Sequence, residues 1–496
     1  MRPPVADHRR GAGVSRSRAD RYLEFIPSIQ SSSSRRCPLT ETKLAPSKSG
    51  AEIDRLPRRL GVWSAAAVLV GSTIGSGIFR VPSSVAAAVG SPGAMLLIWV
   101  IGALVALFGA LTLAELAAMY PRTGGIYVFL KETYGPVPAF LFGWTELLVI
   151  RPSALGAIAM IFAEYLRVFV PMADGQVRVV AGAAIVLLAL ANIRSVSWGA
   201  AVQNASTVAK VAALVGLAAA AFFWGDGTTG SLAQPLSFQP LSWGGFGVAL
   251  IAVMWAYDGW ADLTFMAGEV RDPGRTLPRA LLSGTLGIAA VYLVVNLAYL
   301  YVLPVDEMAS SRLVAATAAE KVFTAGAAIV AAMVMVSAFG ALNGSTMTGP
   351  RIFFAMADDG LFFRPIAAVH PLYQTPYLAI GLAALLGVIY VSVRTFEQLA
   401  DAFILGIWPF YLLSVAAVFI QRWRRPDAER PYRTVGYPVI PLLFLLASLA
   451  MLLNSLIRQF GTTMISFGVI LAGIPVYYLW RGVARRREPG DGGVRG

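Results

Sequence analysis

Two glycine-containing segments interrupt apolar stretches of this chain and hold most of its possible chemistry. The first, Gly71–Phe79, reads GSTIGSGIF and lies within the uncharged stretch 60–79. The second, Trp255–Trp260, reads WAYDGW. A helix in lipid must satisfy its own backbone polar groups, so a break at membrane depth is expected where the backbone faces a cavity or a ligand.

A broken helix has free backbone N–H groups, which carry partial positive charge, and free carbonyl groups, which carry partial negative charge. At the first break we expect the N–H groups of Ser76, Gly77 and Ile78 to begin a new half-helix, whose positive end attracts a carboxylate. At both breaks we expect the half-helices on the cytoplasmic side to end in unpaired carbonyls, near Ser72–Thr73 and Trp255–Ala256, which attract an ammonium group. Adjacent anion and cation sites suit the α-carboxylate and α-amine of an amino acid. Alternatively, the glycines only permit close helix packing.

Charged side chains at membrane depth are further functional candidates. Lys210 is the only charged residue of the stretch 200–224 and lies about ten residues into it, too deep to reach the surface easily. Asp258 lies in the second break. Glu146 and Arg151 share one stretch but are five residues apart, so they do not lie on one helix face, and we expect each to pair with other helices.

Other charged residues lie near expected helix ends. Glu115, Arg122, Glu269 and Arg271 are expected at the inner ends as inner-gate or structural ion pairs. Arg80 follows the first break, toward an outer vestibule, and the sequence assigns it no role.

The composition indicates a membrane protein. Hydrophobic residues make up 57% of the 496 residues, charged residues 14%, and the mean hydropathy is +0.67. Apolar stretches long enough to span a bilayer recur along the chain. The sequence predicts an all-α protein with twelve transmembrane helices, at 61–88, 94–119, 136–165, 179–193, 200–224, 244–268, 279–303, 322–356, 376–393, 400–421, 436–457 and 462–480.

The net charge of +13 is concentrated in the tails and in alternate loops. This pattern follows the positive-inside rule and predicts a multi-pass protein of the plasma membrane (the inner membrane of a bacterium) with both termini in the cytoplasm, rather than a nucleic-acid-binding protein. Residues 1–55 are expected to form a disordered basic tail and 481–496 a second basic tail. With one cysteine, Cys37, and two histidines, His8 and His370, we expect no metal, no cofactor and no catalytic residues.

The two breaks lie in the first and sixth predicted spans, five positions apart, as expected for two five-helix repeats of inverted topology at about 61–224 and 244–421. These repeats form a predicted core at 56–425, followed by two more helices within 426–480. Combined motifs resemble the amino acid–polyamine–organocation superfamily, and within it the L-type amino acid transporter branch. The resemblance rests on Gly71–Phe79, Tyr120–Tyr127, Trp144–Ala154, Ala256–Trp260, Gly268–Pro273 and Thr276–Ala280.

The resemblance implies the LeuT-type fold and sodium-independent exchange or uptake of amino acids. A lysine at the position of Lys210 takes the place of a sodium ion in that family, bonding carbonyls of the first helix and hydroxyls of the eighth, such as Ser337. Losing its proton would allow proton coupling. Trp255 is placed as a gate. The residues expected around the substrate are Thr73, Ser76, Gly77, Ile78, Trp255, Tyr257, Asp258 and Gly259.

Several features remain open. Asp258 pairs with a cationic substrate or braces the backbone, and the aromatic surroundings of Trp255, Tyr257 and Trp260 favour neutral amino acids. The loop 168–179 lacks the cysteine that links animal relatives to a heavy chain, so no such partner is expected, and the chain is expected to be a monomer or homodimer. A channel, a non-transporting sensor and a membrane enzyme are the rival classes; a phosphate-binding loop of ATP-driven pumps is absent.

Overall fold

The computed structural model describes the chain from Arg58 to Arg487 with short gaps. The predicted tail 1–55, residues 488–496 of the predicted C-terminal tail, and Ser76 lie outside the described residues. The described residues are 58, 60–75, 77–194, 196–233, 236, 242–362, 364–368, 370–373 and 375–487.

The predicted all-α class is confirmed. Within the described residues, the one β-type pairing is an isolated bridge between Leu60 and Val270. The same part of the chain contains nine helices long and apolar enough to cross a membrane, and three shorter apolar helices. The long and intermediate helices, in chain order, are α3 (Pro92–Met119), α5 (Pro136–Thr145), α6 (Arg151–Leu166), α7 (Asp174–Arg194), α8 (Val196–Trp224), α11 (Pro273–Val302), α14 (Gly326–Asp358), α15 (Tyr377–Val393), α16 (Phe396–Arg424), α17 (Val439–Arg458) and α18 (Phe460–Arg487).

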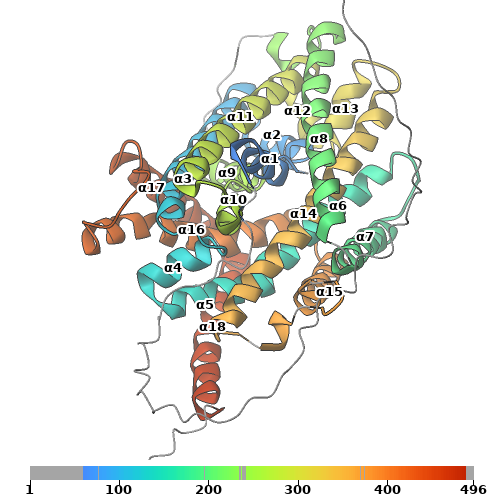
Figure 1. The fold of residues 1–496 in the computed structure, drawn as a ribbon. Coiled ribbons are helices and arrows are strands. Elements are labelled where there is room, and N and C mark those ends of the chain that lie inside the picture. Colours follow the sequence, from blue (N-terminus) through green and yellow to red (C-terminus); the bar gives the residue numbers. More distant parts are fainter. Residues whose placement is uncertain are drawn as a thin grey trace, which may run out of the picture. The chain divides into compact units, whose positions relative to one another are not determined.

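Both predicted breaks are confirmed. The first predicted span is divided into α1 (Val62–Thr73), a 3-10 turn η1 (Gly77–Phe79) and α2 (Val81–Val89). The sixth predicted span, which contains the second break, is divided into α9 (Trp243–Tyr257) and the short α10 (Asp262–Phe265). These pieces lie in the middle of the helical bundle, with α3, α8, α11 and α14 packed against them (Figure 1).

Small residues allow the broken helices to lie close to α3. A Cβ atom on Gly102 would come within 2.3 Å of Val253, and one on Gly109 within 2.6 Å of the Trp260 ring. The two glycines are seven residues apart and therefore share one face of α3. Without a hydrophobic driving force between helices in lipid, such close contact is how helices gain packing energy.

Three short helices were not predicted. They are α4 (Ile126–Tyr134), α12 (Val305–Ser310) and α13 (Val314–Glu320). Each is too short to cross a bilayer, and a search for long apolar stretches does not detect such connecting helices. The segment between α5 and α6, Glu146–Ile150, is a π-helical turn.

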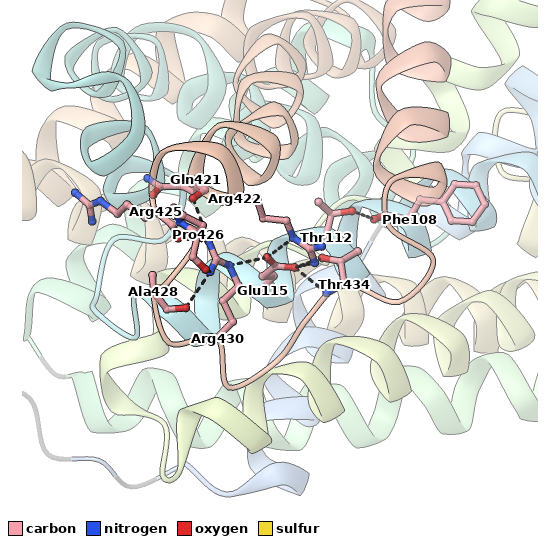
Figure 2. Close-up of polar contacts among 10 residues, drawn as sticks. All are labelled: Phe108, Thr112, Glu115, Gln421, Arg422, Arg425, Pro426, Ala428, Arg430 and Thr434. Atoms are coloured by element: carbon pink, nitrogen blue, oxygen red, sulfur yellow. Dashed lines mark hydrogen bonds and ion pairs between the residues drawn. The ribbon is translucent and has the colours of Figure 1, made fainter.

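One buried carboxylate joins α3 to α16 and to the segment before α17 (Figure 2). Glu115, which is 1% exposed, accepts hydrogen bonds from Arg422 Nε at 2.9 Å and from Arg422 Nη2 at 2.7 Å. Thr434 donates from both its backbone N–H (2.7 Å) and its hydroxyl (2.8 Å), and Arg430 Nε lies 3.4 Å away. Arg422 also stacks on the Tyr437 ring at 3.8 Å. Glu115 is thus a structural ion in this conformation.

The Glu115 cluster generates a stability prediction. Glu115→Gln should leave two arginines without their counter-ion, and removal of one partner of a buried ion pair costs about 3 kcal/mol. We expect a clear fall in the unfolding temperature of the purified protein in detergent. Glu429→Gln, in the exposed part of the same segment, is the control and should leave that temperature unchanged. Equal unfolding temperatures for the two variants would contradict this role for Glu115.

Candidate functional site

The two broken helices cross at their breaks. A Cβ atom on Gly77 would lie 2.7 Å from the Ala256 Cα atom, and one on Gly259 would lie 2.7 Å from Thr73 Oγ1 and 2.8 Å from its N atom. Each glycine therefore faces backbone of the other segment, and the contacts run antiparallel. Gly259 also has φ of +113°, which side chains rarely adopt. This contact requires glycine at positions 77 and 259.

A cavity of about 70 Å³ lies beside the crossing, with space for roughly five water molecules. Its walls come from both breaks, the π-helical turn, α6, α14 and α16. Five of the eight residues expected around a substrate line it: Thr73, Gly77, Trp255, Asp258 and Gly259.

The remaining expected residues do not line this cavity or are not described. Ile78 is fully buried outside its lining, and Ser76 lies outside the described residues. Tyr257 faces away: its ring packs 5.7 Å from Trp99 and 5.2 Å from Tyr292. Asp258 follows the last residue of α9 with extended backbone (φ −63°, ψ 151°) and lines the cavity, whereas Tyr257 does not.

The expected aromatic surroundings are present in part, because Trp255, Phe265 and Phe403 line the cavity. Trp260 packs on Tyr411 at 4.8 Å, away from the cavity. The same lining also contains three carboxyl groups and one guanidinium, those of Glu146, Asp258, Asp262 and Arg151.

The side assigned to α9 is also corrected. We expected the half-helix that ends at Trp255–Ala256 to lie on the cytoplasmic side together with α1. Instead α9 packs along α2, on the opposite side of the crossing from α1. In the predicted order of spans the chain reverses direction at each one, so a sixth span would enter the membrane from the face opposite to the first. The two sides of the crossing are named for these helices, the α1 side and the α2 side.

Side chains satisfy the backbone carbonyls freed by the first break. Lys210, 1% exposed, donates from Nζ to the Gly71 carbonyl at 3.0 Å, so the predicted contact with the first helix is confirmed. The Ser337 hydroxyl donates to the Gly75 carbonyl at 3.4 Å. In place of the predicted bond between Lys210 and a hydroxyl of the eighth span, the two side chains thus make separate contacts with the first broken helix.

Tyr292 joins the two breaks and was not singled out from the sequence. Its hydroxyl lies 2.9 Å from the Thr73 carbonyl and 3.1 Å from the Ala256 carbonyl, so one donor is shared between the ends of α1 and α9. From the sequence alone, a tyrosine that bonds backbone in this way cannot be told from one that only packs within an apolar span.

The expectation that Glu146 and Arg151 pair with other helices is wrong for Glu146. Arg151 Nε donates to Glu146 at 2.8 Å, and a second guanidinium nitrogen bonds the same oxygen. The π-helical turn causes this pairing, because its hydrogen bonds join residues five apart and bring both side chains to one face. Arg151 also donates to the Ser345 hydroxyl on α14 at 2.8 Å, which links two walls of the cavity.

Two aspartates face the cavity from the second break. Asp258 accepts a hydrogen bond from the Tyr411 hydroxyl at 2.8 Å. Asp262, four residues later, is bonded by the side chain of Ser72 on α1. Asp262 was overlooked although it lies within an apolar span, where a carboxylate is a functional candidate.

An aromatic layer closes the cavity on the α2 side. Trp255 lines the cavity and packs edge-on against Phe403 at 5.0 Å and Phe396 at 6.1 Å. Arg80 lies over the Phe396 ring at 5.7 Å and forms an ion pair with Glu397 at 2.5 Å. Arg80, to which the sequence assigned no role, is thus part of this closure.

The charged residues at the other helix ends make the following contacts with described residues. Arg122 pairs with Glu132 at 2.5 Å. The backbone of Glu269 accepts from the Leu60 N–H at 3.0 Å, and the Arg271 side chain bonds the Arg58 carbonyl at 3.4 Å. These contacts hold the start of α1 beside the end of the second broken span.

The chain is similar to known amino acid permeases over most of its length. An amino acid permease family model matches residues 60–479. The serine/threonine exchanger SteT of Bacillus subtilis (strain 168) is 32% identical over 86% of this chain and 98% of its own length. The human b(0,+)-type amino acid transporter 1 is 33% identical (86% and 88%), and the mouse large neutral amino acids transporter small subunit 2 is 31% identical (90% and 85%).

A membrane-spanning bundle with two broken helices crossing at a small polar cavity defines a membrane transporter rather than an enzyme. The chain belongs to the amino acid permease family of the amino acid–polyamine–organocation superfamily.

The shared hydroxyl at the crossing generates a prediction for transport. Tyr292→Phe should leave the Ala256 carbonyl without the donor it has in the described chain, while the Thr73 carbonyl keeps only the Gly75 N–H at 2.7 Å. An unsatisfied buried polar group costs about 1–3 kcal/mol. We expect the initial uptake rate of labelled amino acid into proteoliposomes to fall about tenfold at unchanged protein content. Tyr299→Phe is the matched control: it lies on the same face of α11, and its buried hydroxyl has no hydrogen-bond partner within the described chain. Equal rates for the two variants would exclude the proposed bridge.

Proposed function

We propose that this protein carries L-amino acids with small neutral side chains across the membrane by alternating access, without sodium, as exchange or as proton-coupled uptake. The observation that carries the proposal is the crossing of the two broken helices beside a small polar cavity. Twelve spans with LeuT-type inverted repeats at 61–224 and 244–421, in a core of 56–425, are part of the proposal. So are cytoplasmic termini, which make the α2 side the outer side.

The backbone at the crossing supports recognition of the α-carboxylate. The η1 turn begins at Gly77, which lines the cavity, and N–H groups that begin a helical turn have no partner within it. We propose that N–H groups of Ser76, Gly77 and Ile78 bind the carboxylate. The carboxyl groups of Asp258 and Asp262, together with nearby backbone carbonyls, would face the α-ammonium group.

The closure on the α2 side supports Trp255 as a gate. Its ring forms one wall of the cavity while contacting Phe396 and Phe403, both on α16. A rotation of that ring would open a path toward Arg80. The cavity beneath Trp255 has a volume of about 70 Å³, which favours a substrate with a small side chain.

Lys210 supports independence from sodium. Its ammonium group already supplies a positive charge to the Gly71 carbonyl, where an ion would otherwise be needed. The neutral substrate class is supported by Asp258, whose carboxylate is engaged by Tyr411, and by the likeness to a serine/threonine exchanger.

A cationic substrate is the second candidate. The observation that favours it is the excess of carboxyl groups over guanidinium groups around the cavity. A channel and a non-transporting sensor are two further functions that such a scaffold can support. For assembly, we propose a monomer or homodimer without a disulfide-linked heavy chain, because the loop 168–179 contains no cysteine.

The proposal is tested by counterflow into liposomes preloaded with an amino acid mixture, recording which labelled amino acids enter. Wild type should accumulate small neutral amino acids, and Asp258→Asn should weaken all substrates together by severalfold, because the carboxylate braces Tyr411 rather than a substrate side chain. Asp427→Asn, in an exposed segment, is the control.

Each rival function gives a distinct result in this experiment. A wild type that carries only Arg or Lys, or a variant that loses those two and keeps neutral transport, would establish a cationic substrate. Conductance without saturable counterflow would indicate a channel, and binding without flux would indicate a sensor.

A further inference from the structure

A second cavity, of about 230 Å³, lies on the α2 side and takes no part in the transport step proposed at the crossing. Its walls come from the start of α2, the end of α6, the start of α7, the segment between α12 and α13, and the start of α16. Phe396 forms part of this wall and contacts Trp255, which lines the central cavity. The aromatic layer therefore separates the two cavities.

Most charges of this outer cavity are already paired. Arg80 pairs with Glu397 at 2.5 Å and also bonds the Arg312 carbonyl. Arg167 pairs with Asp174 at 2.9 Å. Arg178 donates to the Ser392 carbonyl at 3.2 Å. Glu164 and Arg312 are the two charged residues of the lining that remain.

Two opposite charges in the lining have no hydrogen-bond partner within the described part of the chain. Glu164 Oε2 is buried and accepts no hydrogen bond there, although Arg80, Arg312 and Arg167 lie within electrostatic range. The Arg312 guanidinium makes no hydrogen bond or ion pair with described residues and is exposed in the same cavity. A buried carboxylate oxygen without a donor is costly, so an ammonium ligand has a favourable place beside it.

The position of Glu164 is fixed by its neighbour. Tyr165 donates from its hydroxyl to the Phe79 carbonyl at 2.9 Å, which ties the end of α6 to the turn that follows the first break. Glu164 therefore keeps its place next to the path between the two cavities.

We propose that the outer cavity is a second binding site for the zwitterionic α-amino acid, with the Arg312 guanidinium binding the carboxylate and Glu164 binding the ammonium group. An amino acid held there waits on the α2 side of the aromatic layer before Trp255 and Phe396 move. This inference rests on the proposed function, since it takes the transported amino acid as the ligand. It goes further by placing a second, one-sided site outside the central cavity.

The test compares the KM for labelled L-serine from the two faces of the membrane, using intact cells and inverted membrane vesicles. Glu164→Gln and Arg312→Gln should each raise KM about tenfold at the membrane face on the α2 side and leave KM at the opposite face unchanged. A tenfold rise is the loss expected for one charge-assisted hydrogen bond. Arg312→Lys, which keeps the charge, should restore part of the affinity. Lys321→Gln is the control, because Lys321 pairs with Glu307 outside this cavity.

Unchanged KM values in both glutamine variants, or equal rises at both faces, would overturn the second site while leaving transport intact. If wild type moves no amino acid, the proposed function fails by itself. Equilibrium binding of L-serine to the purified protein then decides the outer site: binding weakened by Glu164→Gln retains it, and binding insensitive to Glu164→Gln, or no binding, removes it.

Discussion

Where α1 and α9 end, the backbone has carbonyl groups that no helix can satisfy, and lipid offers no water to bond them. In the structure the two broken helices cross, and the crossing brings donors to these carbonyl groups. Gly77 and Gly259 let the two broken segments touch, and Tyr292 shares one hydroxyl between their ends. Lys210 supplies the ammonium group that bonds a third carbonyl. The position of the cavity, its polar lining and the closeness of α3 all follow from bringing the two breaks together.

The same constraint explains why charges accumulate around so small a cavity. Arg151 and Glu146 can lie in an apolar bundle because the π-helical turn lets them neutralise each other, and Ser345 takes another guanidinium hydrogen. On the α2 side the Arg80–Glu397 pair, lying against Phe396, closes the access to the cavity. Because the Glu397 side chain is half exposed, this pair can be broken and remade at modest cost, which suits a closure that must open.

Sequence alone located the breaks, because clusters of glycine inside apolar stretches are rare, and it located Lys210, because a charge at membrane depth stands out. It failed where the answer depends on local hydrogen bonding or on distant partners. The five-residue spacing of Glu146 and Arg151 implies separate faces unless the turn is π-helical, which composition does not indicate. Arg80 finds its partner 317 residues away. The side on which α9 lies follows from counting chain reversals and was within reach of the sequence.

We propose that side chains of this protein, Lys210 above all, hold the first broken helix in place of a sodium ion. The most direct measurement is the initial rate of labelled L-serine uptake into proteoliposomes while sodium is replaced stepwise by choline, for wild type and Lys210→Ala. We expect a wild-type rate independent of sodium, and loss of most activity in the variant at every sodium concentration, because the Gly71 carbonyl loses its donor. A wild-type rate that rises and saturates with sodium, or a fully active Lys210→Ala variant, would contradict this role for the lysine.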